Sequence, residues 1–341
     1  MLFPGHENGI LYLVRNPAKK DILLCFTVLC AVLMLAGCSS LFSKKEMESQ
    51  PLVQATPVQT NAPSPTPTSA PTPAPTPSPT PAPKITDAWY VQRTEEMRKW
   101  MKAYGSYASD EALDEAVANM EIDPDKPMVA LSFDDGPMEG ISDEIVEILQ
   151  AHNARATFFV RGARCKFDVT AGLLQKILGA GCEIGNHTWR HELLTNVSST
   201  QAISSIQRCN DDVFAATGYT IRTLRPPGGK CDYQVERIAK RQNMAIALWA
   251  QSGNVHEHDP EKIAENVELQ IVNGKELEDG DIILLHDTKP WMVEAVKLIV
   301  PRLQAKGYQL VTVQELINLS DRGFVPGEVY HKRIETPEPE E

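Results

Sequence analysis

Short apolar runs alternate with longer amphipathic stretches from Met128 to about residue 319. Each apolar run has the length of a buried strand, and the stretches between them repeat apolar residues with a helical period. The predicted strands are Met128–Phe133, Ala156–Val160, Glu183–Asn186, Thr223–Arg225, Ala245–Trp249, Asp281–His286 and Gln309–Val313. The predicted helices are Ser142–His152, Thr170–Ala180, Thr200–Thr217, Asp232–Arg241, Pro260–Val272 and Trp291–Lys306.

A regular alternation of strands and helices is typical of a parallel sheet whose connections are helices. Seven predicted strands favour a distorted (β/α) barrel of seven to eight strands, and an open doubly wound sheet is the alternative. Neither G-x-G-x-x-G after a strand nor G-x-x-x-x-G-K-[ST] occurs, which argues against a nucleotide cofactor. We therefore predict one α/β domain over residues 127–320.

Residues 1–38 have the features of an export signal. Arg15, Lys19 and Lys20 precede an apolar run that is short for a membrane-spanning helix. The run ends in Leu-Ala-Gly-Cys at Cys38, which resembles the lipobox of bacterial lipoproteins, so we predict that Cys38 carries the lipid. A secretory signal cleaved without lipid and an uncleaved anchor are the alternatives, and all three export the domain.

Three further segments flank the α/β domain. Residues 39–84 are rich in Pro and Thr, favour extended polyproline II, and suit a spacer between a membrane and a cell wall. Residues 85–126 have a helical pattern that Gly105 divides in two, and residues 321–341 are expected to form a disordered acidic tail. The chain is thus expected to be a bacterial membrane lipoprotein whose domain faces the cell wall.

The chain has a formal net charge of -12, from 33 Lys and Arg against 45 Asp and Glu. This balance argues against nucleic acid as a partner. We expect a monomer. The four cysteines of the domain form either two disulfides or a set of buried free thiols, and they lack the close spacing of a zinc site. They are Cys165, Cys182, Cys209 and Cys231.

Two adjacent carboxylates, Asp134 and Asp135, follow the first predicted strand. Gly136 and Pro137 then end that strand in a turn. Because adjacent side chains of an extended strand point to opposite faces, one carboxylate would bind a metal while the other remains a base. An acidic turn without function is the alternative, since Asp-Gly is common in turns.

A histidine pair, His187 and His191, follows the third predicted strand. Its i, i+4 spacing on a helical turn brings both imidazoles to one face, where they can bind one metal. In a barrel the carboxyl ends of the strands meet on one face, so Asp135 joins the pair there. Three protein ligands leave coordination positions open for water and substrate, as a hydrolytic zinc site requires.

Two more strand ends carry polar residues. Arg225 follows the fourth predicted strand, and His286 ends the sixth. Taken alone, each would be an ordinary surface charge or a histidine at the edge of the core. Together with the carboxylates and the histidine pair, they predict one polar site at the carboxyl face of the barrel.

The sequences Ser-Phe-Asp134-Asp135-Gly-Pro, His187-Thr-Trp-Arg-His191, Arg225-Pro-Pro-Gly-Gly and Leu-Leu-His286-Asp occur in this order. They resemble the ordered motifs of the polysaccharide deacetylases, the NodB-homology group or carbohydrate esterase family four. The resemblance extends from about Pro127 to Leu319. It implies a distorted β/α barrel and metal-dependent removal of acetyl groups from sugars.

The resemblance also implies a role for each matching residue. Asp135, His187 and His191 would bind the metal, Zn²⁺ first and Co²⁺ or Ni²⁺ as alternatives. Asp134 would be the general base toward water, held by Arg225, and His286 the general acid that protonates the leaving amine. The predicted substrate-binding residues are Pro226, Gly228, whose backbone N–H would bind the oxyanion, Trp249 and Leu285.

Two positions depart from the family pattern. Gly228 stands where an aromatic residue is frequent, which suggests an altered substrate preference. Ser252 stands where the family commonly has an Asp that tunes the catalytic histidine, so acid catalysis by His286 is expected to be weaker. The candidate substitutes for that Asp are Asp287, Glu257 and Asp259. The run from His256 to Asp259 is interpreted as a solvated loop rather than a second metal site.

Two functions of different classes follow. The first is a metal-dependent deacetylase that removes N-acetyl groups from a cell-surface glycan, with peptidoglycan favoured by the lipid anchor and the spacer. The second is a carbohydrate-binding lipoprotein of the same fold with impaired catalysis, favoured by Ser252. Asp134 and His286 together argue for the enzyme, because a binding protein needs no base and acid pair.

Overall fold

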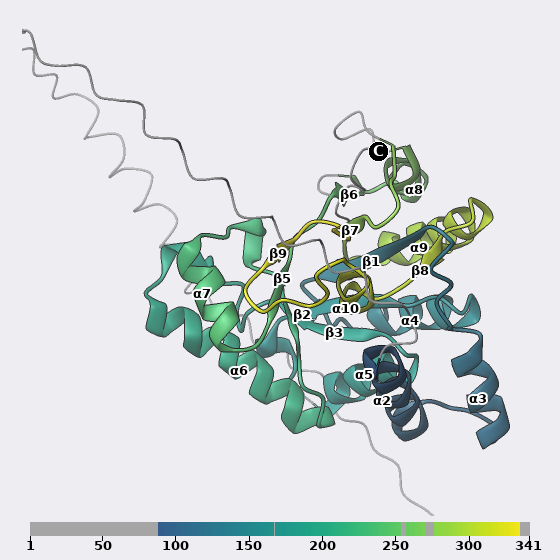
Figure 1. Ribbon diagram of the computed structural model, residues 1–341, viewed down its shortest axis with the longest axis horizontal. Helices are drawn as coiled ribbons and strands as arrows, with labels where there is room; N and C mark the ends of the chain where they lie inside the picture. The colour runs from purple at the N-terminus through teal and green to yellow at the C-terminus, as the bar shows by residue number, and fades with distance from the viewer. Residues whose placement is uncertain (1–87, 167, 254–256, 270–275, 335–341) are drawn as a thin grey trace, which may run out of the picture. The chain divides into compact units, whose positions relative to one another are not determined.

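The computed structural model describes residues 88–166, 168–253, 257–269 and 276–334 (Figure 1). The predicted export signal with Cys38, the linker over 39–84 and residues 335–341 lie outside these described residues. Within them, no helix combines the length and the apolar character needed to cross a membrane.

All seven predicted strands and all six predicted helices are confirmed, with small shifts at their ends. The strands are β1 Met128–Asp134, β2 Ala156–Val160, β3 Glu183–Asn186, β4 Thr223–Leu224, β5 Ala245–Ala247, β6 Gln251–Ser252, β7 Ile282–His286, β8 Gln309–Leu310 and β9 Val329–Tyr330. The helices are α2 Ala88–Tyr104, α3 Asp110–Ala118, α4 Ser142–Ala151, α5 Asp168–Gly179, α6 Ser199–Thr217, α7 Tyr233–Arg241, α8 Pro260–Leu269, α9 Pro290–Ala305 and α10 Val313–Asn318. Short 3₁₀ turns lie at Gly162–Arg164, Leu194–Asn196 and Pro227–Gly229.

The strands form one parallel sheet in the order β6-β7-β1-β2-β3-β4-β5-β9, and β8 pairs with β1. Only residues 248–250 separate β5 from β6, although β6 is the first strand of the sheet order and β5 is the last but one. The sheet therefore curls back toward itself as an incomplete barrel, with the helices along its outside (Figure 1). The predicted distorted barrel is confirmed, and the open doubly wound alternative is wrong.

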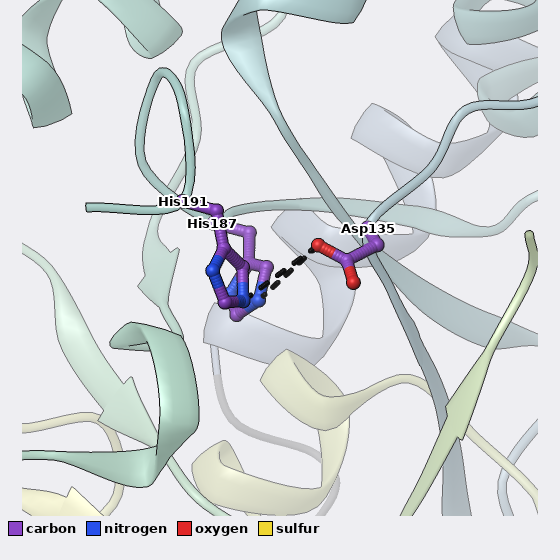
Figure 2. A group of neighbouring side chains, drawn as sticks. All are labelled: Asp135, His187 and His191. Atoms are coloured by element: carbon purple, nitrogen blue, oxygen red, sulfur yellow. Dashed lines mark ion pairs between the residues drawn. The ribbon is translucent and has the colours of Figure 1, made fainter. Parts of the chain in front are cut away.

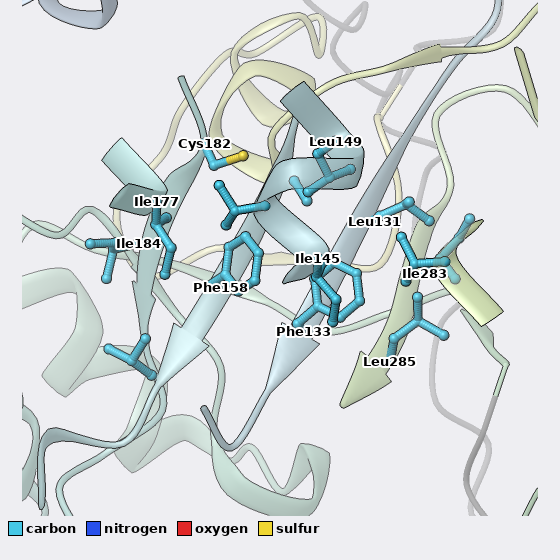
Figure 3. Close-up of a cluster of buried hydrophobic side chains, with 14 of the residues drawn as sticks. Leu131, Phe133, Ile145, Leu149, Phe158, Ile177, Cys182, Ile184, Ile283 and Leu285 are labelled. Carbon is cyan, nitrogen blue, oxygen red and sulfur yellow. The ribbon is translucent and has the colours of Figure 1, made fainter. Parts of the chain in front are cut away.

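The two faces of the curled sheet have different neighbours. Alternate residues of β1, including Leu131 and Phe133, point outward into a core shared with the helices (Figure 3). In that core the rings of Phe133 and Phe158 stack with their centroids 5.1 Å apart. The other face turns inward, where α10 fills the end of the barrel at which β1 begins. Inward positions near the opposite end of β1, Ser132 and Asp134, are polar and fully or almost fully buried.

The chain after residue 320 is part of the fold as far as Ile334, so the predicted tail over 321–341 is wrong in this part. Strand β9 pairs with β5, and the side chain of Tyr330 is only 1% exposed. The Tyr330 hydroxyl donates to the carbonyl of Gly323 and accepts from the N–H of Val325. A strand of two residues produces no recognisable pattern of apolar positions, which is why the sequence did not indicate it.

The segment before the barrel is helical, and its first helix ends directly before Gly105, as predicted. A side chain at Gly105 would come within 2.7 Å of the Gly179 carbonyl of α5, so only a glycine allows this close approach. The hydroxyl of Tyr107 donates to the same carbonyl, and that of Tyr104 donates to the Thr217 carbonyl of α6. These contacts attach α2 and its following turn to two helices of the barrel.

The four cysteines of the domain are all free thiols, so the alternative of two disulfides is wrong. Cys165, Cys182 and Cys209 are buried, and Cys231 is partly exposed. Burial raises the pKa of the Cys182 thiol to about 11 and that of Cys209 to about 12. At neutral pH both therefore remain protonated and act as small apolar side chains.

A buried carboxyl group, that of Asp287, lies where β7 ends. Its Oδ2 accepts a hydrogen bond of 2.5 Å from the Ser142 hydroxyl at the start of α4, and its Oδ1 has no hydrogen-bond partner among the described residues. A side chain at Gly136 would clash with this carboxyl group, which therefore packs against the backbone directly after Asp135. Burial, with a smaller contribution from the charge of Asp134, raises the pKa of Asp287 to about 7.

Replacing Tyr330 by alanine tests the role of the segment after residue 320. We expect Tyr330→Ala to lower the free energy of unfolding by roughly 3 kcal/mol, because it leaves a cavity between the sheet and that segment. The control is Tyr233→Ala, since Tyr233 is 71% exposed; that change should stay within about 0.5 kcal/mol. Urea denaturation measures both, and equal effects would contradict the docking of β9.

Replacing Asp287 by asparagine tests the buried carboxyl group. Its folded-state pKa is about 7 against 3.8 for a free side chain, so the native state retains a proton that the unfolded chain loses. Wild-type stability therefore falls between about pH 4 and pH 7, and the penalty is complete above pH 7. We expect Asp287→Asn to gain stability relative to wild type over this interval, by up to about 4 kcal/mol.

Denaturation curves at several pH values measure this gain. The control is Asp125→Asn at an exposed position, whose difference from wild type should stay nearly constant across the same interval. A difference between Asp287→Asn and wild type that does not change with pH would contradict the assignment.

Candidate active site

Three potential metal ligands meet at the carboxyl ends of β1 and β3 (Figure 2). The Oδ1 atom of Asp135 lies 4.0 Å from Nε2 of His187 and 3.8 Å from Nε2 of His191. The ligand atoms of all three residues lie within 4.8 Å of one another, and the part of the chain that the structure describes contains no other such group. The predicted cluster is therefore present.

The backbone brings these ligands together through left-handed conformations. Asp135 has φ 75°, Thr188 has φ 63° and His191 has φ 65°. Such values cost of order 1–3 kcal/mol each in residues other than glycine, and they persist where the surrounding structure imposes them. At Asp135 the conformation turns the chain off the strand at once.

This turn corrects the expectation that the two adjacent carboxylates point to opposite faces. Asp134 Oδ2 lies 3.7 Å from His187 Nε2, and Asp135 Oδ1 lies 4.0 Å from the same atom. Strand β1 ends at Asp134, so the alternation of an extended strand no longer applies to Asp135. Both carboxylates therefore reach one site.

The ring of His187 is fixed by its second nitrogen. Nδ1 lies 2.7 Å from the carbonyl oxygen of Arg225, so this nitrogen carries the proton and donates, and Nε2 faces the carboxylates with a free lone pair. Burial lowers the pKa of His187, against the opposing effect of the Asp134 and Asp135 charges. Burial thus favours the neutral imidazole that a metal requires.

The donor set fits a divalent cation. Asp135 Oδ1 is buried and has no hydrogen-bond partner among the described residues, and Arg161 Nη1 at 3.7 Å is too distant for one. Such an orphaned oxygen faces two imidazole nitrogens. One carboxylate and two histidines are the ligands of hydrolytic zinc sites that leave positions open.

The predicted contact between Arg225 and Asp134 is present and fully buried. Arg225 Nη1 donates to Asp134 Oδ1 at 2.9 Å and to the Ser132 hydroxyl at 2.7 Å. Its other nitrogens donate to the carbonyls of Ala247 and Leu248, and its guanidinium lies 4.0 Å from the centroid of the Phe159 ring. Every side of the cation is thus occupied, which holds Asp134 in one orientation.

Burial lowers the pKa of Arg225, while the charge of Asp134 and the hydrogen bond to it raise the pKa again. The pair is therefore an ion pair in a dry environment. Removing the arginine from such a pair leaves an uncompensated buried charge, which typically destabilises a protein by about 3–5 kcal/mol. Ser132 shares this environment, and sequence inspection missed it because a serine within an apolar strand is common.

His286 ends β7 and is paired in register with Asp134 of β1. Partners in a parallel register share a face of the sheet, so His286 and Asp134 both point inward at the carboxyl end. Ser252 of β6 is paired with Leu284 and lies on this same face; its hydroxyl is buried without a hydrogen-bond partner among the described residues.

The candidate substitutes for the missing Asp are engaged in other contacts. Asp287 accepts from Ser142, Glu257 accepts from the backbone N–H groups of His258 and Asp259, and the Asp259 side chain accepts from the N–H of Glu261. His258 and Asp259 are exposed, in agreement with a solvated loop, and His256 lies outside the described residues.

Three of the four predicted substrate-binding residues lie near Arg225, and the fourth does not. Trp249 is partly exposed, its ring lies against Gly229, and its centroid is 5.8 Å from the Arg225 guanidinium. Gly228 is exposed with φ 63°, and Pro226 is buried beside it. These three residues therefore lie around the buried arginine.

Leu285 is not in the site, which corrects its assignment. It is fully buried on the outer face of β7, in the core that also contains Phe133 (Figure 3). Leu284 occupies the inward face that His286 shares, because residues two apart on a strand point the same way. Strict alternation counted back from His286 would have identified Leu284 from the sequence.

Comparisons with known proteins agree with this geometry. A family model described as polysaccharide deacetylase matches residues 121–247. The chain is 34% identical to the peptidoglycan-N-acetylmuramic acid deacetylase PdaC of Bacillus subtilis, over 57% of this chain and 40% of that protein. It is 31% identical to a peptidoglycan-N-acetylglucosamine deacetylase of Bacillus cereus, over 58% of this chain and 91% of that protein.

A solved structure extends the likeness to three dimensions. The family 4 acetyl xylan esterase of Clostridium thermocellum, in complex with a cobalt ion, superposes with a TM-score of 0.52 at 31% identity. The match covers 60% of this chain and 98% of that structure. The chain spans less than half of the Bacillus subtilis relative but nearly all of the Bacillus cereus one. Fold, ordered motifs and these matches together establish that the chain belongs to the polysaccharide deacetylase family.

Proposed function

We propose that this protein is a metal-dependent deacetylase that removes N-acetyl groups from a cell-surface polysaccharide, with peptidoglycan as the substrate. The observation that carries the proposal is the buried ion pair of Asp134 and Arg225, 3.7 Å from a histidine of the metal donor set. A general base held ionised beside three metal ligands has no use in a protein that only binds sugar.

Asp135, His187 and His191 are the proposed ligands, and Zn²⁺ is the proposed metal. Co²⁺ and Ni²⁺ suit the same donors, and the related acetyl xylan esterase was solved with cobalt. Bound there, the cation would polarise the acetyl carbonyl as a Lewis acid and lower the pKa of a neighbouring water.

The protein groups divide the proton transfers. Asp134 takes a proton from the attacking water, and Arg225 keeps this carboxylate charged and oriented. The water oxygen adds to the acetyl carbon, and the backbone N–H of Gly228 donates to the developing oxyanion. His286 then gives a proton to the amide nitrogen, so that the C–N bond breaks and acetate and a free amine leave.

The proposed substrate is supported by the sequence relatives and by a prediction about the N-terminal segment. Both sequence relatives described above are named as peptidoglycan deacetylases. In addition, the predicted lipid at Cys38 and the linker over 39–84 would hold the domain within reach of the wall. The proposed location is the outer face of the bacterial cell membrane, and the proposed glycan substrate carries N-acetyl groups.

A second candidate function is sugar binding with impaired catalysis. It is favoured by Ser252, whose buried hydroxyl supplies no charge on the face of the sheet that His286 shares. Without a carboxylate at this position, β6 supplies no charged group that would orient His286 as the general acid, so proton donation to the amine would be slower.

Replacing Asp134 by asparagine tests the enzyme proposal. We expect Asp134→Asn to lower acetate release from peptidoglycan by a factor of about 10² or more, because the general base is lost. Zinc should still bind with one ion per chain, since its three ligands remain. Acetate assay and metal analysis, with and without added zinc, measure both effects, and the exposed Asp125→Asn is the control.

Acetate release by the wild-type protein distinguishes the two candidate functions. Zinc-dependent acetate from peptidoglycan supports the deacetylase. A wild type that binds zinc and glycan but releases no acetate would rule out the enzyme and favour the binding protein. In that case Ser252→Asp should raise acetate release, because it adds a carboxylate on the face that His286 shares.

Replacing Cys38 by alanine tests the proposed anchor. We expect Cys38→Ala to abolish lipid labelling and to move the protein from the membrane fraction to the soluble fraction or the medium, because the acylated residue is lost. The control is Cys30→Ala, which removes a thiol from the same export segment. A Cys38→Ala protein that is processed and retained like wild type would disprove the lipid anchor.

A further inference from the structure

Three cationic side chains converge on the ring of Trp189, a residue of the turn between His187 and His191. The guanidinium of Arg208 lies 3.4 Å from the centroid of the Trp189 ring, that of Arg190 lies 4.3 Å away, and the ammonium of Lys166 lies 4.8 Å away. All three cations are exposed. We call Trp189 and these three residues the cationic cluster.

The cationic cluster is not neutralised by ion pairs. Among the described residues, none of its three cations lies within ion-pair distance of a carboxylate. Two carboxylates lie near the cluster. Asp212 accepts from the indole N–H of Trp189, and Glu192 accepts from the Ser205 hydroxyl and from the N–H of Arg190. Like charges around one ring repel, so an anion placed among them would relieve a standing cost.

The cluster is built on a fixed support. The side chain of Trp189 belongs to a residue that is only 8% exposed. Its backbone N–H donates to the Ser205 hydroxyl of α6, and its backbone carbonyl accepts from the N–H of Ala163. A side chain at Gly162 would lie 2.7 Å from the indole ring, so the backbone also packs against the ring. An arginine stacked on an immobile ring loses less freedom when it binds an anion.

The position of the cluster connects it to the active site. Trp189 and Arg190 lie in the turn between His187 and His191, at the carboxyl end of β3. The side chain of His191 is 39% exposed, so the metal donor set opens to solvent next to Arg190. The cluster is therefore attached to the same backbone turn as the two histidines of the metal donor set.

A cavity of about 370 Å³ adjoins the cluster on the side of α6. Its wall carries hydroxyl and amide groups that suit a sugar; the residues include Trp189, Glu192, Thr200, Gln201, Ser204 and Arg208. Its volume falls in the range of small-molecule sites, which is enough for a sugar unit and its substituent.

We propose that the cationic cluster and this cavity form a subsite for an anionic substituent of the glycan. The inference rests on the proposed function for the identity of the ligand as a cell-wall glycan, and it adds the chemical class of the group that is recognised. Arginine pairs with carboxylate and phosphate through two parallel hydrogen bonds, so either group fits. In a cell wall, the lactyl carboxylate of N-acetylmuramic acid residues without a peptide supplies the first, and the phosphodiesters of teichoic acid supply the second.

Binding, rather than turnover, tests the subsite. The zinc-loaded Asp134→Asn protein is titrated calorimetrically with three ligands. They are a peptide-free oligosaccharide of alternating N-acetylglucosamine and N-acetylmuramic acid, a chitin oligosaccharide of equal length, and glycerol-phosphate teichoic acid. We expect one of the two anionic ligands to bind at least tenfold tighter than the neutral chitin oligomer at low salt, and this preference to shrink in 0.5 M salt.

Variants locate the preference. Arg190→Gln together with Arg208→Gln should reduce the affinity for the preferred anionic ligand to about that for chitin. The control is Lys99→Gln, because Lys99 also lies over a tryptophan, Trp100 at 4.6 Å, but on α2; it should change nothing. The salt dependence of the Asp134→Asn protein tests the contribution of charge to this preference without the arginine substitutions.

The outcomes test the anion subsite separately from the proposed deacetylase function. Tighter binding of the muramic acid oligomer assigns the subsite to a carboxylate, and tighter binding of teichoic acid assigns it to a phosphate. Equal affinity for charged and neutral ligands, or a preference that survives Arg190→Gln with Arg208→Gln, would overturn the subsite. Absence of acetate release by the wild type would overturn the deacetylase but would leave a measured binding preference intact.

Discussion

The buried guanidinium of Arg225 is the interaction on which the site depends. It donates to Asp134 and Ser132 of β1 and to the carbonyls of Ala247 and Leu248 at the end of β5, so it ties together strands from different parts of the sheet. Its own carbonyl accepts from the ring of His187. One residue thus fixes both the proposed base and the orientation of a proposed metal ligand, and the dry environment makes each of these contacts strong.

A cation can occupy this position only because the curled sheet encloses it. The outer face of β1 is packed against helices through Leu131 and Phe133, while the inner face is filled by α10 at one end and by polar groups at the other. Apolar packing over most of the barrel compensates the cost of burying charge and of the left-handed backbone at Asp135 and His191. The site is therefore a small polar region supported by a large apolar one.

The loops around this polar region carry the side chains that a bound ligand would contact. The turn that carries His187 and His191 also carries Trp189, whose backbone and indole are bonded to α6. The loop that follows β2 brings Lys166 to the same ring. The proposed metal ligands and the tryptophan of the proposed anion subsite thus lie on one turn. Ser252, in contrast, lies on strand β6 within the polar region and not in a surrounding loop.

The sequence by itself indicated seven of the nine strands that the structure describes, their succession along the chain and the residue types at their carboxyl ends. It did so because an apolar run flanked by helical periods has few alternatives, and because parallel strands direct their ends to one face. The outward position of Leu285, the approach of Asp135 to Asp134, the pairing of β9 and the convergence of three cations on Trp189 were decided only by the tertiary structure. Each depends on backbone conformation or on contacts between distant segments, and neither leaves a local signal in the order of residues.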